Sequence, residues 1–348
     1  MKNRPTGASR RPPRRRCWTG SLAVIAGLLG AQAASADTLT EIRQRGDLRC
    51  GVTQGYPGIS APDDTGVWRG MDTDYCRALA AAILGATARV TFVPLSAKVR
   101  FTALQAGTVD ILARYTSWTF SRDTRQGINF AGILYHDGQG FMVRRTLGVT
   151  SARQLSGASL CTTTGTTTEL NAADYFRSHG MTLRIVAFEK ADEALAAYEA
   201  GRCDAYTTAR MALAGQRTKL KDPAAHVVLP ETISKEPAGP AVRQGDDRFL
   251  KVARWVLNAL VAAEEFGVTR ANVPAMANSA NPEIRRLLGR DGDFGRYLGL
   301  DPLWAARAIG ATGNYGEMFA RSIGALGLSR GVNRPWSKGG ILYAPPFR

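Results

Sequence analysis

VDILARYTSWTFSR, residues 109–122, joins an apolar strand to a turn rich in hydroxyl groups. Its first five residues are predicted to form the strand, and the turn contains Ser117, Thr119 and Arg122. An arginine guanidinium presents a planar set of donors that can bind both oxygens of a carboxylate. In α/β sheets, ligands bind beyond the carboxyl ends of the strands. The stretch therefore predicts a site for a small carboxylate; the alternative is a surface pair between Arg122 and Asp123.

The sequence before this stretch alternates strands with helices. Strands are predicted at 48–53 and 90–93, and helices follow Gly70 and span 97–106. Asp72 is placed to cap the first of these helices, whose apolar residues recur every four positions. This alternation is typical of an α/β layer with a largely parallel sheet.

The same pattern recurs later, and two connecting segments link the two regions. Glycine-containing turns between a helix and a strand occur at 106–110 and again at 200–204. The segments 135–140 and 234–240, rich in Gly or Pro, would carry the chain out of a first lobe and back into it. Two connections beside a cleft permit hinge closure.

We therefore predict a two-lobed α/β fold with two hinge crossings and a helical C-terminal extension. Lobe 1 would begin with 37–138, lobe 2 would span 139–236, and 237–348 would return to lobe 1 and form the extension. The tail alternates short helices with turns that contain Gly and Pro, and we expect it to pack on lobe 1.

A second hydroxyl-rich turn lies in the predicted lobe 2, at 164–169. Gly165 permits close approach of the backbone, and Thr166 with Glu169 matches a capping-box pattern that opens a helix. The free N–H groups at a helix N-terminus favour an anion. We expect this turn, including Thr167, to face Arg122 across the cleft and bind the same carboxylate; an ordinary capped helix is the alternative.

Three further residues are candidates for the pocket. Tyr56 and Trp118 could stack on the ligand or pack within their lobe, and Arg114 could face the cleft from the end of a buried strand. The three histidines are dispersed, and none lies in a recognisable catalytic motif. No nucleotide-binding motif occurs. We therefore expect no catalytic residue, no metal site and no cofactor.

The N-terminus, residues 1–36, has the features of a cleaved export signal. Basic residues without acids precede an apolar run at 21–30 and a small-residue pattern that predicts cleavage after Ala36. The run is too short for a permanent membrane anchor. Removal of the basic segment would lower the formal net charge from +16 to about +9. The remaining basic residues form no stripe with stacking aromatics, so we expect a soluble periplasmic protein with no nucleic-acid partner.

Four cysteines follow the predicted cleavage site: Cys50, Cys76, Cys161 and Cys203. An even set in an oxidising compartment favours disulfides. The pairs Cys50–Cys76 and Cys161–Cys203 are preferred among three possible pairings because each closes a local loop, which contributes roughly 3–4 kcal/mol. Buried free thiols are the alternative.

Longer strings throughout the mature chain match one family: CGVTQG (50–55), PLSAK (94–98), SRDT (121–124), DGQGFMV (137–143), GTTTEL (165–170), SKEP (234–237), GPAVRQGDD (239–247), GNYGE (313–317) and KGGILYAPP (338–346). On these strings the chain resembles the periplasmic amino-acid-binding proteins of ABC importers, especially the general L-amino-acid-binding branch. The resemblance implies a type II periplasmic binding protein, a monomer whose lobes close on one amino acid and deliver it to a membrane ABC permease.

The resemblance also implies roles for individual residues. The residues that would hold the α-carboxylate are Arg122, Ser117 and Thr119, with the backbone amides of Thr166 and Thr167. The loop from Gln54 to Tyr56 would line the side-chain pocket.

Two positions depart from the pattern of this family. The aspartate that receives the ligand's α-ammonium in relatives corresponds to Ala209, and Arg114 stands where relatives carry a small polar residue. Because an ammonium buried without a carboxylate is costly, an organic acid that lacks an ammonium is an alternative ligand. A second alternative is an exported enzyme similar to cyclohexadienyl dehydratase, with Glu169 and Glu193 as the candidate acids.

Overall fold

The computed structural model describes residues 37–348, and the predicted signal peptide lies outside the described residues. The strands are β1 (Leu48–Val52), β2 (Ala61–Pro62), β3 (Trp68–Arg69), β4 (Val90–Pro94), β5 (Ile111–Leu112), β6 (Ile128–Phe130), β7 (Tyr135–Asp137), β8 (Gln139–Arg144), β9 (Ser159–Thr163), β10 (Arg184–Phe188), β11 (Ala205–Ala209), β12 (His226–Val228), β13 (Glu236–Ala238) and β14 (Ala241–Arg243). The helices are α1 (Thr38–Arg45), α2 (Met71–Leu84), α3 (Arg100–Gln105), α4 (Phe120–Arg125), α5 (Thr168–Ser178), α6 (Ala191–Glu199), α7 (Arg210–Arg217), α8 (Asp247–Glu265), α9 (Val273–Met276), α10 (Pro282–Leu287), α11 (Phe294–Leu298), α12 (Trp304–Thr312) and α13 (Tyr315–Arg321).

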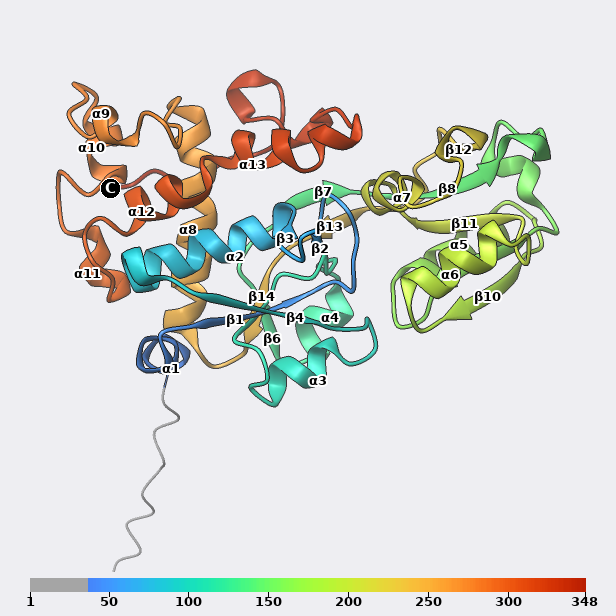
Figure 1. Ribbon diagram of the computed structural model, residues 1–348, viewed down its shortest axis with the longest axis horizontal. Helices are drawn as coiled ribbons and strands as arrows, with labels where there is room; N and C mark the ends of the chain where they lie inside the picture. The colour runs from blue at the N-terminus through green and yellow to red at the C-terminus, as the bar shows by residue number, and fades with distance from the viewer. Residues whose placement is uncertain (1–36) are drawn as a thin grey trace, which may run out of the picture. The chain divides into compact units, whose positions relative to one another are not determined.

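Two five-stranded sheets share one pairing pattern (Figure 1). The first has the order β4-β1-β5-β14-β6, and the second has the order β10-β9-β11-β8-β12. In each sheet the first two pairings are parallel and the last two are antiparallel. Strand β14 follows every strand of the second sheet in sequence, so the chain leaves the first sheet, builds the second and returns. This arrangement confirms the predicted α/β fold with two crossings.

The two crossing segments form a small sheet of their own. Strand β7 pairs with β13 in antiparallel register, and Figure 1 shows the two strands between the larger sheets. The backbone N–H of His136 in β7 donates to Asn333 Oδ1 at 2.8 Å, and Asn333 Nδ2 donates back to the His136 carbonyl at 2.9 Å. The C-terminal extension therefore covers the outer edge of this hinge.

Helices cover both faces of each large sheet, as the apolar patterns of the strands require. Residues of β1, α2 and α8 share the largest buried cluster, and residues of α3 and β5 form a second cluster on the first sheet. In the second sheet, α6 and α5 contribute to separate clusters. Helix α2 is apolar around most of its circumference, and nearly all of it is buried.

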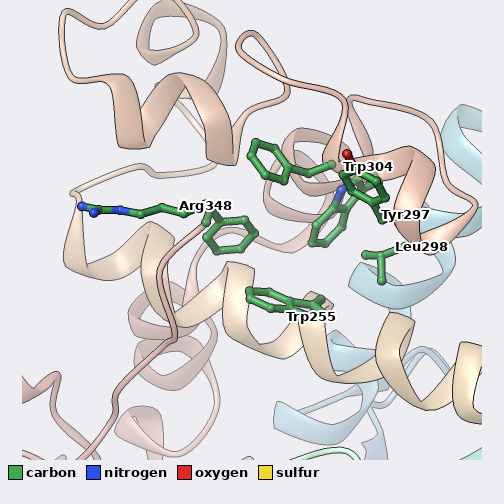
Figure 2. Close-up of a pocket in the computed structure, with 7 residues that line it drawn as sticks. Trp255, Tyr297, Leu298, Trp304 and Arg348 are labelled. Atoms are coloured by element: carbon green, nitrogen blue, oxygen red, sulfur yellow. The ribbon is translucent and has the colours of Figure 1, made fainter.

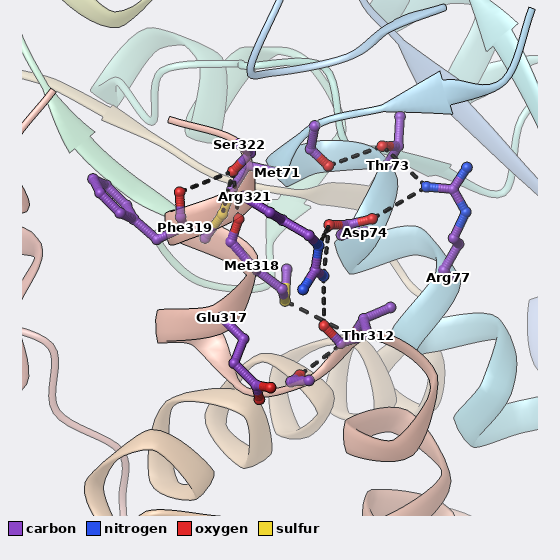
Figure 3. Close-up of polar contacts among 12 residues, drawn as sticks. Met71, Thr73, Asp74, Arg77, Thr312, Glu317, Met318, Phe319, Arg321 and Ser322 are labelled. Atoms are coloured by element: carbon purple, nitrogen blue, oxygen red, sulfur yellow. Dashed lines mark hydrogen bonds and ion pairs between the residues drawn. The ribbon is translucent and has the colours of Figure 1, made fainter. Parts of the chain in front are cut away.

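The C-terminal extension packs on lobe 1, as the sequence predicts. Helix α12 lies against α2 and α8. Figure 3 shows Arg321 of α13 reaching α2, where its Nε donates to Asp74 Oδ2 at 2.7 Å. At the end of the chain, the ring of Phe347 lies 5.1 Å from Trp255 of α8 and 6.3 Å from Trp304 of α12 between ring centroids. Figure 2 shows the two tryptophans around this aromatic hollow.

Both predicted disulfides are confirmed. Cys50–Cys76 joins β1 to α2, and Cys161–Cys203 joins β9 to the turn before β11. The first disulfide therefore ties a strand to a helix that packs on it, and the second ties a strand to the turn that leads into the neighbouring strand β11. Within residues 37–348, no helix has the length and apolar character that a membrane crossing requires.

Some local predictions were wrong in detail. Asp72 does not cap α2, whose N-cap is Gly70; its carboxylate instead accepts a hydrogen bond from the Tyr115 backbone N–H at 2.8 Å. The strand predicted at 109–113 shortens to Ile111–Leu112. Tyr115, which follows this strand, adopts a positive φ of 49°.

Candidate functional site

A polar pocket lies where the turn before α4, the N-terminus of α5 and the crossing strand β13 meet. It is lined by Tyr56, Arg100, Arg114, Tyr115, Ser117, Arg122, Thr166, Thr167, Thr168, Thr208, Ala209 and Glu236. The lining combines residues that follow strands of the first sheet with residues that follow strands of the second. The pocket therefore lies between the two predicted lobes.

The structure brings together most of the candidate residues but not all of them. Tyr56, Arg114, Ser117, Arg122, Thr166 and Thr167 line the pocket, whereas Gln54, Trp118, Thr119 and Gly165 do not. The Trp118 ring stacks on Phe130, with centroids 5.1 Å apart, so it packs within lobe 1. The Gly165 carbonyl accepts a hydrogen bond from Arg100 Nη2 at 3.3 Å and so contacts the wall of the pocket indirectly.

Arg122 is positioned by the first turn of α4. Thr119 is the N-cap of this helix, and its hydroxyl accepts a hydrogen bond from the Arg122 N–H at 3.3 Å. The Arg122 side chain turns back, and Nη1 donates to the Ser117 carbonyl at 2.9 Å. Burial lowers the pKa of the guanidinium to about 10, although the negative charge of Glu236 opposes this shift. Arg122 is therefore charged at neutral pH.

The turn that carries Ser117 is held from two sides. The Trp118 N–H donates to the Pro237 carbonyl in β13 at 2.7 Å, and Ser117 forms a β-bridge with Ala238. Tyr115 has the left-handed backbone that few residues other than glycine adopt, and its hydroxyl donates to Asp137 in β7. The turn is thus attached directly to both hinge strands.

The N-terminus of α5 lines this pocket with Thr166, Thr167 and Thr168. The predicted capping box of Thr166 and Glu169 is wrong, because Thr167 is the N-cap and its side chain does not cap the helix. The Thr166 hydroxyl donates to the Thr163 carbonyl at 2.7 Å and accepts a hydrogen bond from the Thr168 backbone N–H at 3.3 Å. The N–H groups at a helix N-terminus favour an anion, which is the reason that an anion was expected here from the sequence.

Glu236 of β13 is a pocket residue that the sequence analysis missed. Its side chain is 4% exposed and accepts hydrogen bonds from Ser117 Oγ, Thr167 Oγ1, Asn171 Nδ2 and Ser234 Oγ. These donors are neutral, so they solvate the carboxylate without cancelling its charge. Among residues 37–348, Glu236 is the only carboxylate on the pocket wall. The one signal in the sequence was an acid inside the second hinge crossing.

Arg100 was missed as well. It begins α3 and lines the pocket together with Arg114, which was a candidate. Burial and the nearby charges of Arg114 and Arg122 hold the pKa of Arg100 well below its usual value. An arginine within a short apolar helix was the only sequence signal.

The acids considered for an enzymatic alternative lie elsewhere. Neither Glu169 nor Glu193 lines the pocket, and Glu193 is exposed and pairs with Lys190 at 3.7 Å. Ala209, where the resemblance places the usual ammonium-binding aspartate, does line the pocket.

Two α/β lobes, two hinge strands and a polar pocket between the lobes define a solute-binding protein. The chain belongs to the bacterial extracellular solute-binding proteins, family 3, whose family model matches residues 48–269.

Individual relatives resemble the chain over most of its length. The General L-amino acid-binding periplasmic protein AapJ of Rhizobium johnstonii is 52% identical over 92% of this chain and 95% of its own. The Glutamate/glutamine/aspartate/asparagine-binding protein BztA of Rhodobacter capsulatus is 51% identical over 94% and 98%, respectively. A solved periplasmic binding protein of an ABC transporter from Brucella ovis, with glutathione bound, is 55% identical with a TM-score of 0.88 and covers 90% of this chain and 100% of its own. These relatives are binding proteins, so they do not favour the enzymatic alternative.

Proposed function

We propose that this chain is the periplasmic solute-binding component of an amino-acid ABC importer. It captures a small L-amino acid between lobe 1 (37–138 and 237–348) and lobe 2 (139–236) and acts as a monomer that delivers the ligand to a membrane permease. The names of its relatives support the amino-acid class, since AapJ is named as a general L-amino acid-binding protein and BztA as a protein that binds glutamate, glutamine, aspartate and asparagine.

The observation that carries this proposal is that Arg122 and the N-terminus of α5 line one pocket. The α-carboxylate of the ligand pairs with the Arg122 guanidinium and accepts hydrogen bonds from backbone N–H groups at the start of α5, among them that of Thr167. The α-ammonium faces Glu236, because position 209 is an alanine and Glu236 is the one carboxylate among the described residues that line the pocket.

Hinge closure follows from where these groups lie. Arg122 belongs to lobe 1 and can bind the carboxylate while the lobes are open, whereas α5 reaches the same carboxylate only when they close. A ligand shifts the protein toward the closed form only through such differential contacts. Direct contacts between the lobes add to the closed form; one is the hydrogen bond from Lys219 Nζ to the Gly55 carbonyl at 3.3 Å.

Calorimetric titration of the Arg122→Ala variant with L-amino acids tests the proposal. We expect a loss of at least about 2 kcal/mol of binding free energy, or roughly 30-fold in Kd, because a buried carboxylate loses its charged partner. Arg125→Ala is the matched control, since Arg125 is exposed on the same helix. Parent-like binding by Arg122→Ala would show that the anchor is misassigned. If the protein bound a 2-oxo acid but not the matching amino acid, its ligand would be an organic acid and not an amino acid.

A further inference from the structure

Arg100 places a buried cation inside the pocket without an acidic partner. Its side chain is 2% exposed, and Nη1 and Nη2 donate only to the backbone carbonyls of Ala97 and Gly165, at 2.8 and 3.3 Å. Its buried Nε has no hydrogen-bond partner anywhere in residues 37–348. A buried donor left without an acceptor is costly, and a buried charge is normally paired. The Arg100 guanidinium can therefore donate to a further acceptor, which no described residue of the protein supplies.

The neighbouring arginines also lack an acidic partner. Within the described part of the chain, none of Arg100, Arg114 and Arg122 forms an ion pair. Arg114 is 7% exposed, and its Nε donates to the Leu95 carbonyl at 3.0 Å. Asp72 is an acidic neighbour of Arg114. Because burial raises the pKa of the Asp72 carboxyl to about 7, this carboxyl is only partly charged at neutral pH and neutralises Arg114 only in part.

The charges on the pocket wall do not balance. Three guanidinium groups and one carboxylate line the pocket, which leaves a surplus of two positive charges. An amino acid with a neutral side chain brings one carboxylate and one ammonium and leaves this surplus unchanged. A ligand with a second carboxylate reduces it and gives Arg100 an acceptor.

We propose that Arg100 and Arg114 form a second anion subsite and that the ligand of this protein is a dicarboxylate. The first carboxylate binds at Arg122, so this inference rests on the proposed function for the orientation of the ligand. Arg100 and Arg122 lie 4.5 and 6.0 Å from the centroid of the same Phe101 ring, so the two subsites border one aromatic side chain. Either an acidic amino acid or a dicarboxylate without an ammonium supplies this chemistry.

Titration of the parent protein and an Arg100→Gln variant with L-glutamate, L-glutamine and 2-oxoglutarate tests the subsite. Glutamate and glutamine differ only in the second carboxylate, so the ratio of their Kd values reports on the subsite even if part of a variant is misfolded. We expect the parent to prefer glutamate, and Arg100→Gln to lose about 100-fold in glutamate affinity while glutamine stays within about threefold. Arg100→Lys, which keeps the charge, should retain part of the preference. Arg125→Gln, exposed on α4, should retain all of it.

The outcomes separate the two proposals. A parent that binds glutamine as tightly as glutamate, or an Arg100→Gln variant with an unchanged ratio, overturns the second subsite and leaves the proposed function intact. A parent that binds 2-oxoglutarate but neither amino acid supports the dicarboxylate subsite and overturns the amino-acid assignment.

Discussion

At the scale of single residues, the contact between Asp72 and Tyr115 fixes one wall of the pocket. Tyr115 is the only residue other than glycine with a positive φ among residues 37–348, and the Asp72 carboxylate accepts a hydrogen bond from its backbone N–H. Burial raises the pKa of Asp72 from 3.8 to about 7, against the opposing effects of this hydrogen bond and of Arg114. Asp72, which holds the turn at Tyr115, therefore gains its proton at a much higher pH than an ordinary aspartate.

The Asp72→Asn variant should change how stability depends on pH. A folded-state pKa above the unfolded value means that the folded protein binds the proton more tightly. The stability that this carboxyl contributes is therefore complete below about pH 4 and is lost as the pH rises to about 7. Asparagine keeps an acceptor for the Tyr115 N–H but does not titrate. The advantage of the variant over the parent should grow across this range by at most about 4 kcal/mol.

Urea unfolding at several pH values between 4.5 and 7.5 measures this difference. Parallel stability profiles for the parent and Asp72→Asn would show that the carboxyl titrates normally and that its burial has little effect.

At the scale of elements, α7 connects the lobes. Its Met211 and Ala212 belong to the large buried cluster of lobe 1, and the Met211 N–H donates to Asp137 of the hinge at 2.9 Å. Gly215 packs so closely against the loop after β1 that a Cβ there would lie 2.3 Å from the Pro57 carbonyl oxygen. Only glycine fits this contact, which lies one residue from the pocket residue Tyr56.

Gly215→Ala should therefore weaken ligand binding more than it weakens folding. The added methyl group must push α7 away from the loop in the closed form, whereas hinge opening relieves the clash in the free protein. We expect a loss of about tenfold or more in affinity for an L-amino acid, with an unfolding free energy close to that of the parent. Calorimetry and urea unfolding measure the two effects.

Gly310→Ala in α12 is the matched control, because a Cβ at this helical position meets no atom within 4 Å. It should raise stability by up to about 1 kcal/mol and leave affinity unchanged. If Gly215→Ala and Gly310→Ala bound the L-amino acid with equal affinity, the contact of α7 with the loop after β1 would play no part in closure of the lobes.

At the scale of the whole molecule, the sequence predicted what depends on local chain geometry. The strand and helix alternation, the two crossings and both disulfides follow from spacing along the chain, and the structure confirms them. Arg122 lines the pocket from α4, the helix that follows β5 in the chain, and its role in binding stays a prediction.

What the sequence did not reveal depends on contacts between distant segments. Glu236 meets Ser117 across 119 positions, and Arg100 meets Gly165 across 65. No spacing rule indicates that such residues share a pocket. The capping box of Thr166 and Glu169 failed for a local reason, since the helix begins one residue later, at the N-cap Thr167, and the Thr166 hydroxyl donates to the Thr163 carbonyl.

A crystal structure of the protein with bound L-glutamate tests the central claim most directly. We predict that one carboxylate bridges the Arg122 guanidinium and the backbone N–H groups at the start of α5, with the ammonium toward Glu236 and the second carboxylate at Arg100. A ligand whose carboxylates both lie away from Arg122, or one bound outside the pocket between the lobes, would contradict the account.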